Sequence, residues 1–208
     1  MIRQPFRYQY NNVALWLIGI NVLVYVAMKY LRVGPLYALL PMSPNRVLNG
    51  QIWTFVTYMF VHDVFGFSHI LFNMFALYIF GTRVEQRMGS REFLLFYLVT
   101  GALAGVFSFI VYCINGTNVT LIGASGAIFA VELAYAVFFP DSIIYLWGIL
   151  PLRAPVMVIG FTALALISSI FGLNQGVAHL THLAGFGFAW LYFLIRFGIN
   201  PWQRLRLR

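Results

Sequence analysis

Long apolar runs separated by short charged or turn segments constrain this chain more than any other feature. A helix of roughly 20 apolar residues crosses a bilayer core about 30 Å thick, and six stretches reach or approach that length. They run from Val13 to Val33, Phe67 to Gly81, Phe93 to Cys113, Ala124 to Phe139, Val156 to Gly172 and Leu180 to Gly198. The second, fourth and fifth are short, but short spans can lie behind longer neighbours. We therefore predict an all-α membrane protein, a polytopic bundle of six transmembrane helices.

The composition excludes a water-soluble domain. Of the 208 residues, 62% are apolar and 9% are charged, whereas about a quarter of an average soluble domain is charged. The basic residues stand at the edges of apolar runs, where orientation in a membrane explains them better than nucleic-acid binding does. We expect the lipid bilayer, and no nucleic acid, as the surroundings of this chain.

Neither a metal nor a disulfide is indicated by the cysteines and histidines. Cys113 is the one cysteine in the sequence. The nearest approach to a ligand pair is His179 with His182, and no acidic or cysteine ligand stands beside them. We expect no metal and no other cofactor.

The basic residues also predict an orientation. With the N-terminus in the cytoplasm, ten arginines lie inside and three basic residues lie outside, which agrees with the positive-inside rule. The inside set is Arg3, Arg7, Arg83, Arg87, Arg91, Arg153, Arg196, Arg204, Arg206 and Arg208, and the outside set is Lys29, Arg32 and Arg46. Both termini are then cytoplasmic, and spans two, four and six begin on the outer side. The first run is too long for a signal-peptide core, so we expect one domain over residues 1–208 with no separate soluble domain.

Two connections carry apolar surface. The long one, from Gly34 to Phe67, ends in a run of aromatic and aliphatic residues, and we expect it to lie in the membrane interface rather than in water. Ile143 to Leu150 is a weaker interfacial candidate.

Four polar residues gather at one depth of the predicted bundle. His69 and Asn73 start the second span, Ser125 starts the fourth and His182 starts the sixth, all on the outer side. Polar side chains in membrane helices usually face the bundle interior and mark a functional site. A serine hydroxyl needs a neighbouring base such as neutral histidine, and the resulting oxyanion needs hydrogen-bond donors. The set is therefore typical of a serine hydrolase.

Each of these residues also has a plainer interpretation. Ser125 stands between Gly123 and Gly126, and small residues of this kind commonly mark helix contacts in membranes. His182 alone could be an interfacial histidine, and Asn73 could bond a neighbouring helix. The hydrolase interpretation depends on all four meeting at one depth.

The residues around these positions resemble the rhomboid intramembrane serine proteases. The resemblance rests on three motifs, in order along nearly the whole chain: residues 69–73 (HILFN), 123–129 (GASGAIF) and 182–185 (HLAG). Glu85-Gln86-Arg87 also matches the family's Glu-x-Arg element, which we interpret as a structural tie at the cytoplasmic end. The resemblance implies a multi-pass protein of a bacterial inner (plasma) membrane that cleaves transmembrane protein substrates near the outer boundary; it leaves the oligomeric state open.

The resemblance also implies a role for each motif residue. Ser125 would be the nucleophile and His182 the general base and later acid, in a dyad with no third acidic member. His69, Asn73 and the Ser125 backbone would form the oxyanion site. Phe129, one turn after Ser125, would pack its ring against the catalytic histidine; the plainer interpretation of Phe129 is core packing.

The chain departs from the family pattern at two positions. Thr54 follows Trp53 where the family often has arginine, which puts a loop-anchoring contact in doubt. The family usually has a pair of small residues after the histidine of span six. Here the pair is Gly185 and Ala189, and the second is one methyl group larger than usual, so span four could sit slightly farther from span six.

Glu132 is a further polar residue within the fourth span. It lies seven residues after Ser125, about 10 Å deeper on nearly the same helix face, too far to orient His182. We expect a protonated carboxyl bonded to another helix, with a role in water or proton access as the alternative.

Two other functions compete with proteolysis. A non-proteolytic rhomboid-like protein that binds membrane clients would typically have lost the serine or the histidine, and this chain keeps both. A small transporter would explain Glu132, but the sequence has no convincing inverted repeat.

Overall fold

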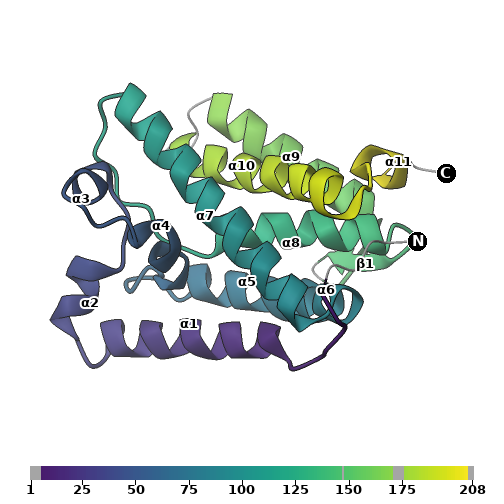
Figure 1. Cartoon of the computed structure of the whole chain (residues 1–208), viewed down its shortest axis with the longest axis horizontal. Helices are drawn as coiled ribbons and strands as arrows, with labels where there is room; N and C mark the ends of the chain where they lie inside the picture. Colours follow the sequence, from purple (N-terminus) through teal and green to yellow (C-terminus); the bar gives the residue numbers. More distant parts are fainter. Residues whose placement is uncertain (1–5, 147, 171–175, 206–208) are drawn as a thin grey trace.

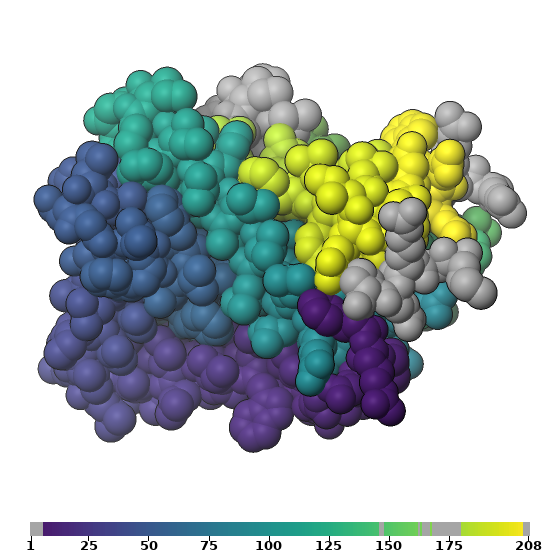
Figure 2. Space-filling model, in the orientation of Figure 1, coloured from purple at the N-terminus to yellow at the C-terminus, as the bar shows by residue number. Residues whose placement is uncertain are grey.

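The chain folds into a bundle of helices, seen in a computed structural model that describes residues 6–146, 148–170 and 176–205. Within those ranges, the side chains of residues 146, 162, 164–166, 168–170 and 176–179 lie outside the description. Helix α1 (Val13–Lys29) forms one edge of the bundle, and the C-terminal helices lie on the other side of the long helix α7 (Ser90–Ile114) (Figures 1 and 2).

Every predicted span contains a helix. The second span is α5 (Ser68–Ala76), which continues through the π-helical turn η2 (Leu77–Gly81) into α6 (Thr82–Met88). The fourth is α8 (Ser125–Phe138) and the fifth is α9 (Ala154–Ile170). The sixth is α10 (Gly176–Tyr192), extended by the π-helical turn η3 (Phe193–Phe197) and followed by the short α11 (Pro201–Leu205). Phe171 and Gly172, which we placed in the fifth span, lie outside the described residues, as do Arg3, Arg206 and Arg208.

Two helical segments of the described chain are long and apolar enough to cross a membrane. These are Ser90–Ile114 and Leu180–Phe197, while α1 and α8 are apolar but shorter. Large apolar side chains nevertheless cover the outside of the bundle, including Trp16 and Leu23 of α1, which are 69% and 68% exposed. A crossing by all six segments stays a prediction.

The all-α prediction is wrong at one place. Between α8 and α9 the chain forms an antiparallel hairpin of strands β1 (Ile143–Leu146) and β2 (Leu150–Arg153), with Ile144 opposite Leu152. β-branched and aliphatic residues favour extended backbone, and a turn closes the hairpin at Gly148, which has φ +72°. The hairpin includes Ile143 to Leu150, the segment that the sequence indicated as a weaker candidate for the membrane interface. Ile143 and Tyr145 are exposed.

The long connection between α1 and α5 is built of short helices and partly buried. They are α2 (Gly34–Leu39), α3 (Pro44–Leu48), α4 (Thr54–Thr57) and the 3₁₀ turn η1 (Tyr58–Phe60). Tyr58 and Met59 are fully buried against α7, where a Cβ on Gly101 would overlap the Met59 sulfur. The Tyr58 hydroxyl donates to the Gly101 carbonyl at 2.8 Å. The end of the connection is thus part of the bundle core.

This connection is anchored although threonine stands at position 54. The Trp53 indole donates to the Leu39 carbonyl at 2.9 Å, and the Thr57 hydroxyl donates to the Leu40 carbonyl at 2.8 Å. The Arg46 guanidinium donates to the carbonyls of Pro41 and Tyr37 at 3.1 and 2.8 Å. Arg46 therefore gives this connection a guanidinium anchor, although residue 54, where the family often has arginine, is threonine.

Glu85 ties three segments together at the opposite end of the bundle. Its carboxylate accepts from the backbone N–H groups of Val13 and Ala14, which begin α1, at 2.7 and 2.9 Å. The Ser90 hydroxyl donates to the same carboxylate. A carboxylate at a helix N-terminus satisfies N–H groups that have no intrahelical partner. The structure thus gives the Glu-x-Arg element the structural role that the sequence suggested.

Candidate active site

Ser125 and His182 are in hydrogen-bond contact. His182 Nε2 lies 2.8 Å from Ser125 Oγ, although the two residues are 57 positions apart. Ser125 is the first residue of α8, and His182 lies early in α10. Because α8 is surrounded by α7, α9, α10 and η2, its first residue lies between helices rather than on the outside.

Close packing of α8 against α10 sets the distance between these two residues. A Cβ on Gly185 would overlap the carbonyl oxygen of Gly126, so the two backbones are in direct contact. One turn further along α10, Ala189 is fully buried in the core. Its extra methyl group is accommodated, and Ser125 and His182 still meet.

The ring of Phe129 stacks on the His182 imidazole. The ring centroids are 4.4 Å apart and the planes differ by 7°. Phe186 in turn packs edge-on against Phe129, with centroids 5.2 Å apart. Because Phe129 is one turn after Ser125 on α8, this helix carries both the serine and the ring that limits rotation of the histidine.

His69 faces the turn that leads into Ser125. Gly123 has φ +108°, and a Cβ there would lie 2.8 Å from His69 Nε2, so both the backbone angle and the close approach require glycine. The Gly123 N–H donates to the Tyr58 carbonyl at 3.0 Å, which ties this turn to the buried end of the long connection.

A backbone contact of His69 indicates which of its two ring nitrogens carries the proton. The Asp63 N–H donates to His69 Nδ1 at 3.4 Å, which leaves the proton on Nε2, the nitrogen that faces Gly123. Asn73, one turn further along α5, is buried and donates one amide hydrogen to the His69 carbonyl at 2.6 Å. An asparagine amide has two N–H donors, so a second donor remains.

Comparison with known proteins agrees with this geometry. A family model described as the rhomboid domain matches residues 49–199. The chain belongs to the rhomboid family. The match takes in all of α5 to α10, and therefore Ser125, His182 and the residues that surround them.

Several relatives of this rhomboid protein carry names that include the family name. It is 29% identical over 180 residues to the rhomboid protease GlpG of Haemophilus influenzae, covering 86% of this chain and 88% of that protein. It is 36% identical over 119 residues to the rhomboid-like protein 11, chloroplastic, of Arabidopsis thaliana, covering 57% of this chain and 39% of that protein. It is 34% identical over 92 residues to the rhomboid protease GluP of Bacillus subtilis, covering 43% of this chain and 18% of that protein.

His62 is a neighbour of this site that the sequence alone did not single out. It is 1% exposed, neither ring nitrogen makes a hydrogen bond to any residue that the structure describes, and its centroid lies 5.1 Å from that of His69. Burial, and secondarily the imidazole of His69, lowers the pKa of His62 to about 3. A histidine inside an apolar run of the long connection is a signal that could have drawn attention to it.

Thr181, next to His182, was also missed. Its hydroxyl lies 2.6 Å from that of Ser108 on α7, and Ser108 donates to the Ala104 carbonyl at 2.9 Å. This buried contact ties the start of α10 to α7 beside the serine–histidine pair. The side chain of His179, one turn earlier, lies outside the described residues.

Glu132 is buried in α8, 5% exposed. One of its carboxyl oxygens, Oε2, makes no hydrogen bond within the described residues. The bond to another helix that we expected is therefore absent at that oxygen.

Proposed function

We propose that this rhomboid protein is an intramembrane serine endopeptidase that cuts transmembrane proteins with a Ser125–His182 dyad. The observation that carries the proposal is the 2.8 Å contact between His182 Nε2 and Ser125 Oγ. That distance lies within hydrogen-bond reach of a nucleophile and its general base. The relatives named rhomboid proteases support the same function.

The first half of the reaction forms an acyl-enzyme. His182 Nε2 takes the proton of the Ser125 hydroxyl as Oγ attacks the scissile carbonyl, and the same nitrogen then returns the proton to the leaving amine. A water molecule repeats the sequence to hydrolyse the ester. The stacked Phe129 ring keeps the imidazole plane directed at Ser125.

Three donors stabilise the oxyanion of each tetrahedral intermediate. They are the Nε2–H of His69, the second amide hydrogen of Asn73 and the backbone N–H of Ser125. The N–H groups of the first helical turn have no partner within the helix, which suits Ser125 to this role. A substrate carbonyl reaches the donors over Gly123, which presents no side chain.

The proposed substrate is a membrane-spanning helix near its outer end. Six spans with both termini in the cytoplasm would place Ser125 in the outer part of the bilayer. The backbone carbonyls of a helix accept hydrogen bonds from N–H groups of the same helix, so a substrate must unwind before Ser125 attacks. Sequences with Gly or Pro near the cut are therefore favoured.

Cleavage by purified protein in liposomes tests this function. A labelled single-span substrate should be cut by the wild type and by Ser142→Ala, a serine control in the connection between α8 and β1, but not by Ser125→Ala or His182→Ala. Cleavage that persists in Ser125→Ala contradicts the mechanism. A folded wild type that binds the substrate without cutting it favours the client-binding alternative.

A further inference from the structure

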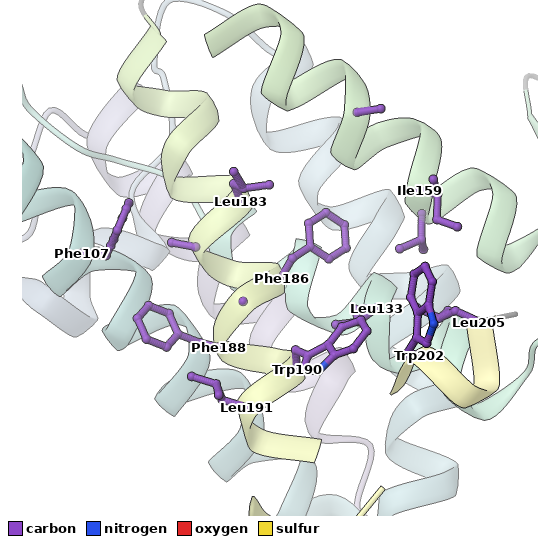
Figure 3. A pocket seen from close by; sticks show the side chains of 14 residues that line it. Phe107, Leu133, Ile159, Leu183, Phe186, Phe188, Trp190, Leu191, Trp202 and Leu205 are labelled. Atoms are coloured by element: carbon purple, nitrogen blue, oxygen red, sulfur yellow. The ribbon is translucent and has the colours of Figure 1, made fainter. Parts of the chain in front are cut away.

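An apolar groove of about 770 Å³ runs along the outside of α10. Its walls come from five helices, and no charged side chain lines it among the described residues. Figure 3 shows Leu183, Phe186 and Trp190 of α10 on one side, and Ile159 of α9 with Trp202 and Leu205 of α11 on the other. The structure thus leaves a hollow between helices on the surface of a membrane protein.

The groove has the length of one leaflet. On α10 it extends from Leu183 to Leu191, eight residues or about 12 Å at 1.5 Å per residue. Half of a hydrocarbon core about 30 Å thick is about 15 Å. The groove begins next to His182 and ends at α11, so it occupies the half of the bundle that lies away from the long connection (Figure 1).

An arginine stands at the α11 end of the groove. Arg204 is exposed and lies on α11 between the lining residues Trp202 and Leu205. The short helix α11 therefore carries a positive charge where the apolar lining ends.

We propose that this groove binds an anionic phospholipid, with an acyl chain along α10 and the phosphate group at Arg204. An apolar cleft one leaflet deep suits a hydrocarbon chain, and each buried CH₂ contributes about 0.8 kcal/mol. Basic pockets between membrane helices bind anionic head groups. An apolar substrate helix has no anionic group to place at Arg204, so the lipid fits better.

The groove lies beside the proposed active site but is a separate feature. Phe186 lines the groove and also packs against Phe129, the ring that stacks on His182. The binding of lipid does not depend on proteolysis, so its test measures binding alone.

Native mass spectrometry with defined lipids tests this proposal. A Cβ at Gly187, which lines the groove, meets no atom within 4 Å, so Gly187→Leu fills the groove without a clash. Gly160→Leu on α9 is the matched control, because Gly160 is equally open but is not part of the lining. Arg83→Gln, a change at an exposed arginine of α6, is the control for Arg204→Gln.

The detergent-solubilised protein is mixed with equal amounts of dioleoyl phosphatidylglycerol and dioleoyl phosphatidylcholine. We expect one retained phosphatidylglycerol, several-fold above phosphatidylcholine, falling at least fivefold in Gly187→Leu and in Arg204→Gln but not in the two controls. Equal retention of both lipids, or unchanged retention in Gly187→Leu, overturns the proposal. Displacement of the lipid by a single-span substrate peptide, lost in Gly187→Leu, would make the groove a helix-docking site and also overturns it.

Discussion

Gly185 of α10 faces the carbonyl oxygen of Gly126 of α8 so closely that no side chain fits between them. Gly126 directly follows Ser125, and Gly185 lies three residues after His182. The contact that brings the two helices together therefore also sets the distance between the serine and the histidine.

The first prediction concerns this contact. Gly185→Ala places a methyl group against backbone that cannot rotate away, so α8 and α10 must separate. Overpacking of this kind costs about 1–3 kcal/mol. We expect a lower Tm in detergent and a loss of cleavage larger than the loss of folded protein.

Gly187→Ala is the matched control, since a Cβ there meets nothing within 4 Å. It should leave both Tm and cleavage near the wild-type values. Wild-type cleavage in a folded Gly185→Ala protein would show that the close contact does not set the Ser125–His182 distance.

The second prediction concerns the Phe129 ring. Phe129→Leu keeps an apolar side chain but removes the ring stacked on His182. Stacked aromatic pairs contribute about 0.5–1.5 kcal/mol, so we expect kcat to fall up to about tenfold with KM nearly unchanged. Phe109→Leu removes a ring from the Phe55–Phe109 pair, neither of which stacks on His182, and should lower the Tm but not kcat. Equal kcat losses in both variants would assign Phe129 to core packing alone.

The third prediction concerns His62 and pH. The folded protein holds the pKa of His62 at about 3, below the ordinary 6.5, so the unfolded chain binds the proton first as the pH falls. Stability contributed by the neutral ring is complete above pH 6.5 and is lost as the pH falls toward 3. At pH 5 the difference is about 2 kcal/mol.

His62→Phe removes this titration while it keeps a buried ring. Between pH 7 and pH 5, we expect the Tm of the wild type in detergent to fall more steeply than that of His62→Phe. Parallel Tm curves would show that His62 is not buried as a neutral ring in solution.

The fourth prediction concerns Glu132. Its distance from Ser125 along α8 is too great for a role at the reacting atoms, so Glu132→Gln, a neutral side chain of the same shape, should cleave a single-span substrate at close to the wild-type rate. A folded but inactive Glu132→Gln protein would assign the carboxyl a role in water or proton access.

The helices could be predicted from the sequence because each apolar run is long and bounded by charged or turn residues. The hairpin at Ile143–Arg153 could not, because its short apolar run has no helical or strand period that decides between the two structures. The burial of Tyr58 and Met59 was equally hidden. It depends on the space left by Gly101 and Gly105 of α7, which are far away in the sequence.

The sequence could predict those residues of the candidate site whose depth in the bundle follows from the topology. Ser125, His182, His69 and Asn73 all lie within the first two turns of their helices, where depth follows directly from the span boundaries. The contacts of Asp63 and His62 with His69 come from the preceding loop, whose path no periodicity describes. Thr181 was hidden for a different reason, because its partner Ser108 is in the middle of a long helix.

Covalent labelling with a fluorophosphonate probe tests the Ser125–His182 dyad most directly. The probe reacts with a serine that a neighbouring base has activated, and peptide mass spectrometry identifies the labelled residue. We predict labelling at Ser125 in the folded wild type, its absence in Ser125→Ala and a reduction of at least a hundredfold in His182→Ala. Labelling of Ser125 at an undiminished rate in His182→Ala, or no labelling of Ser125 in a folded wild type, would contradict the dyad.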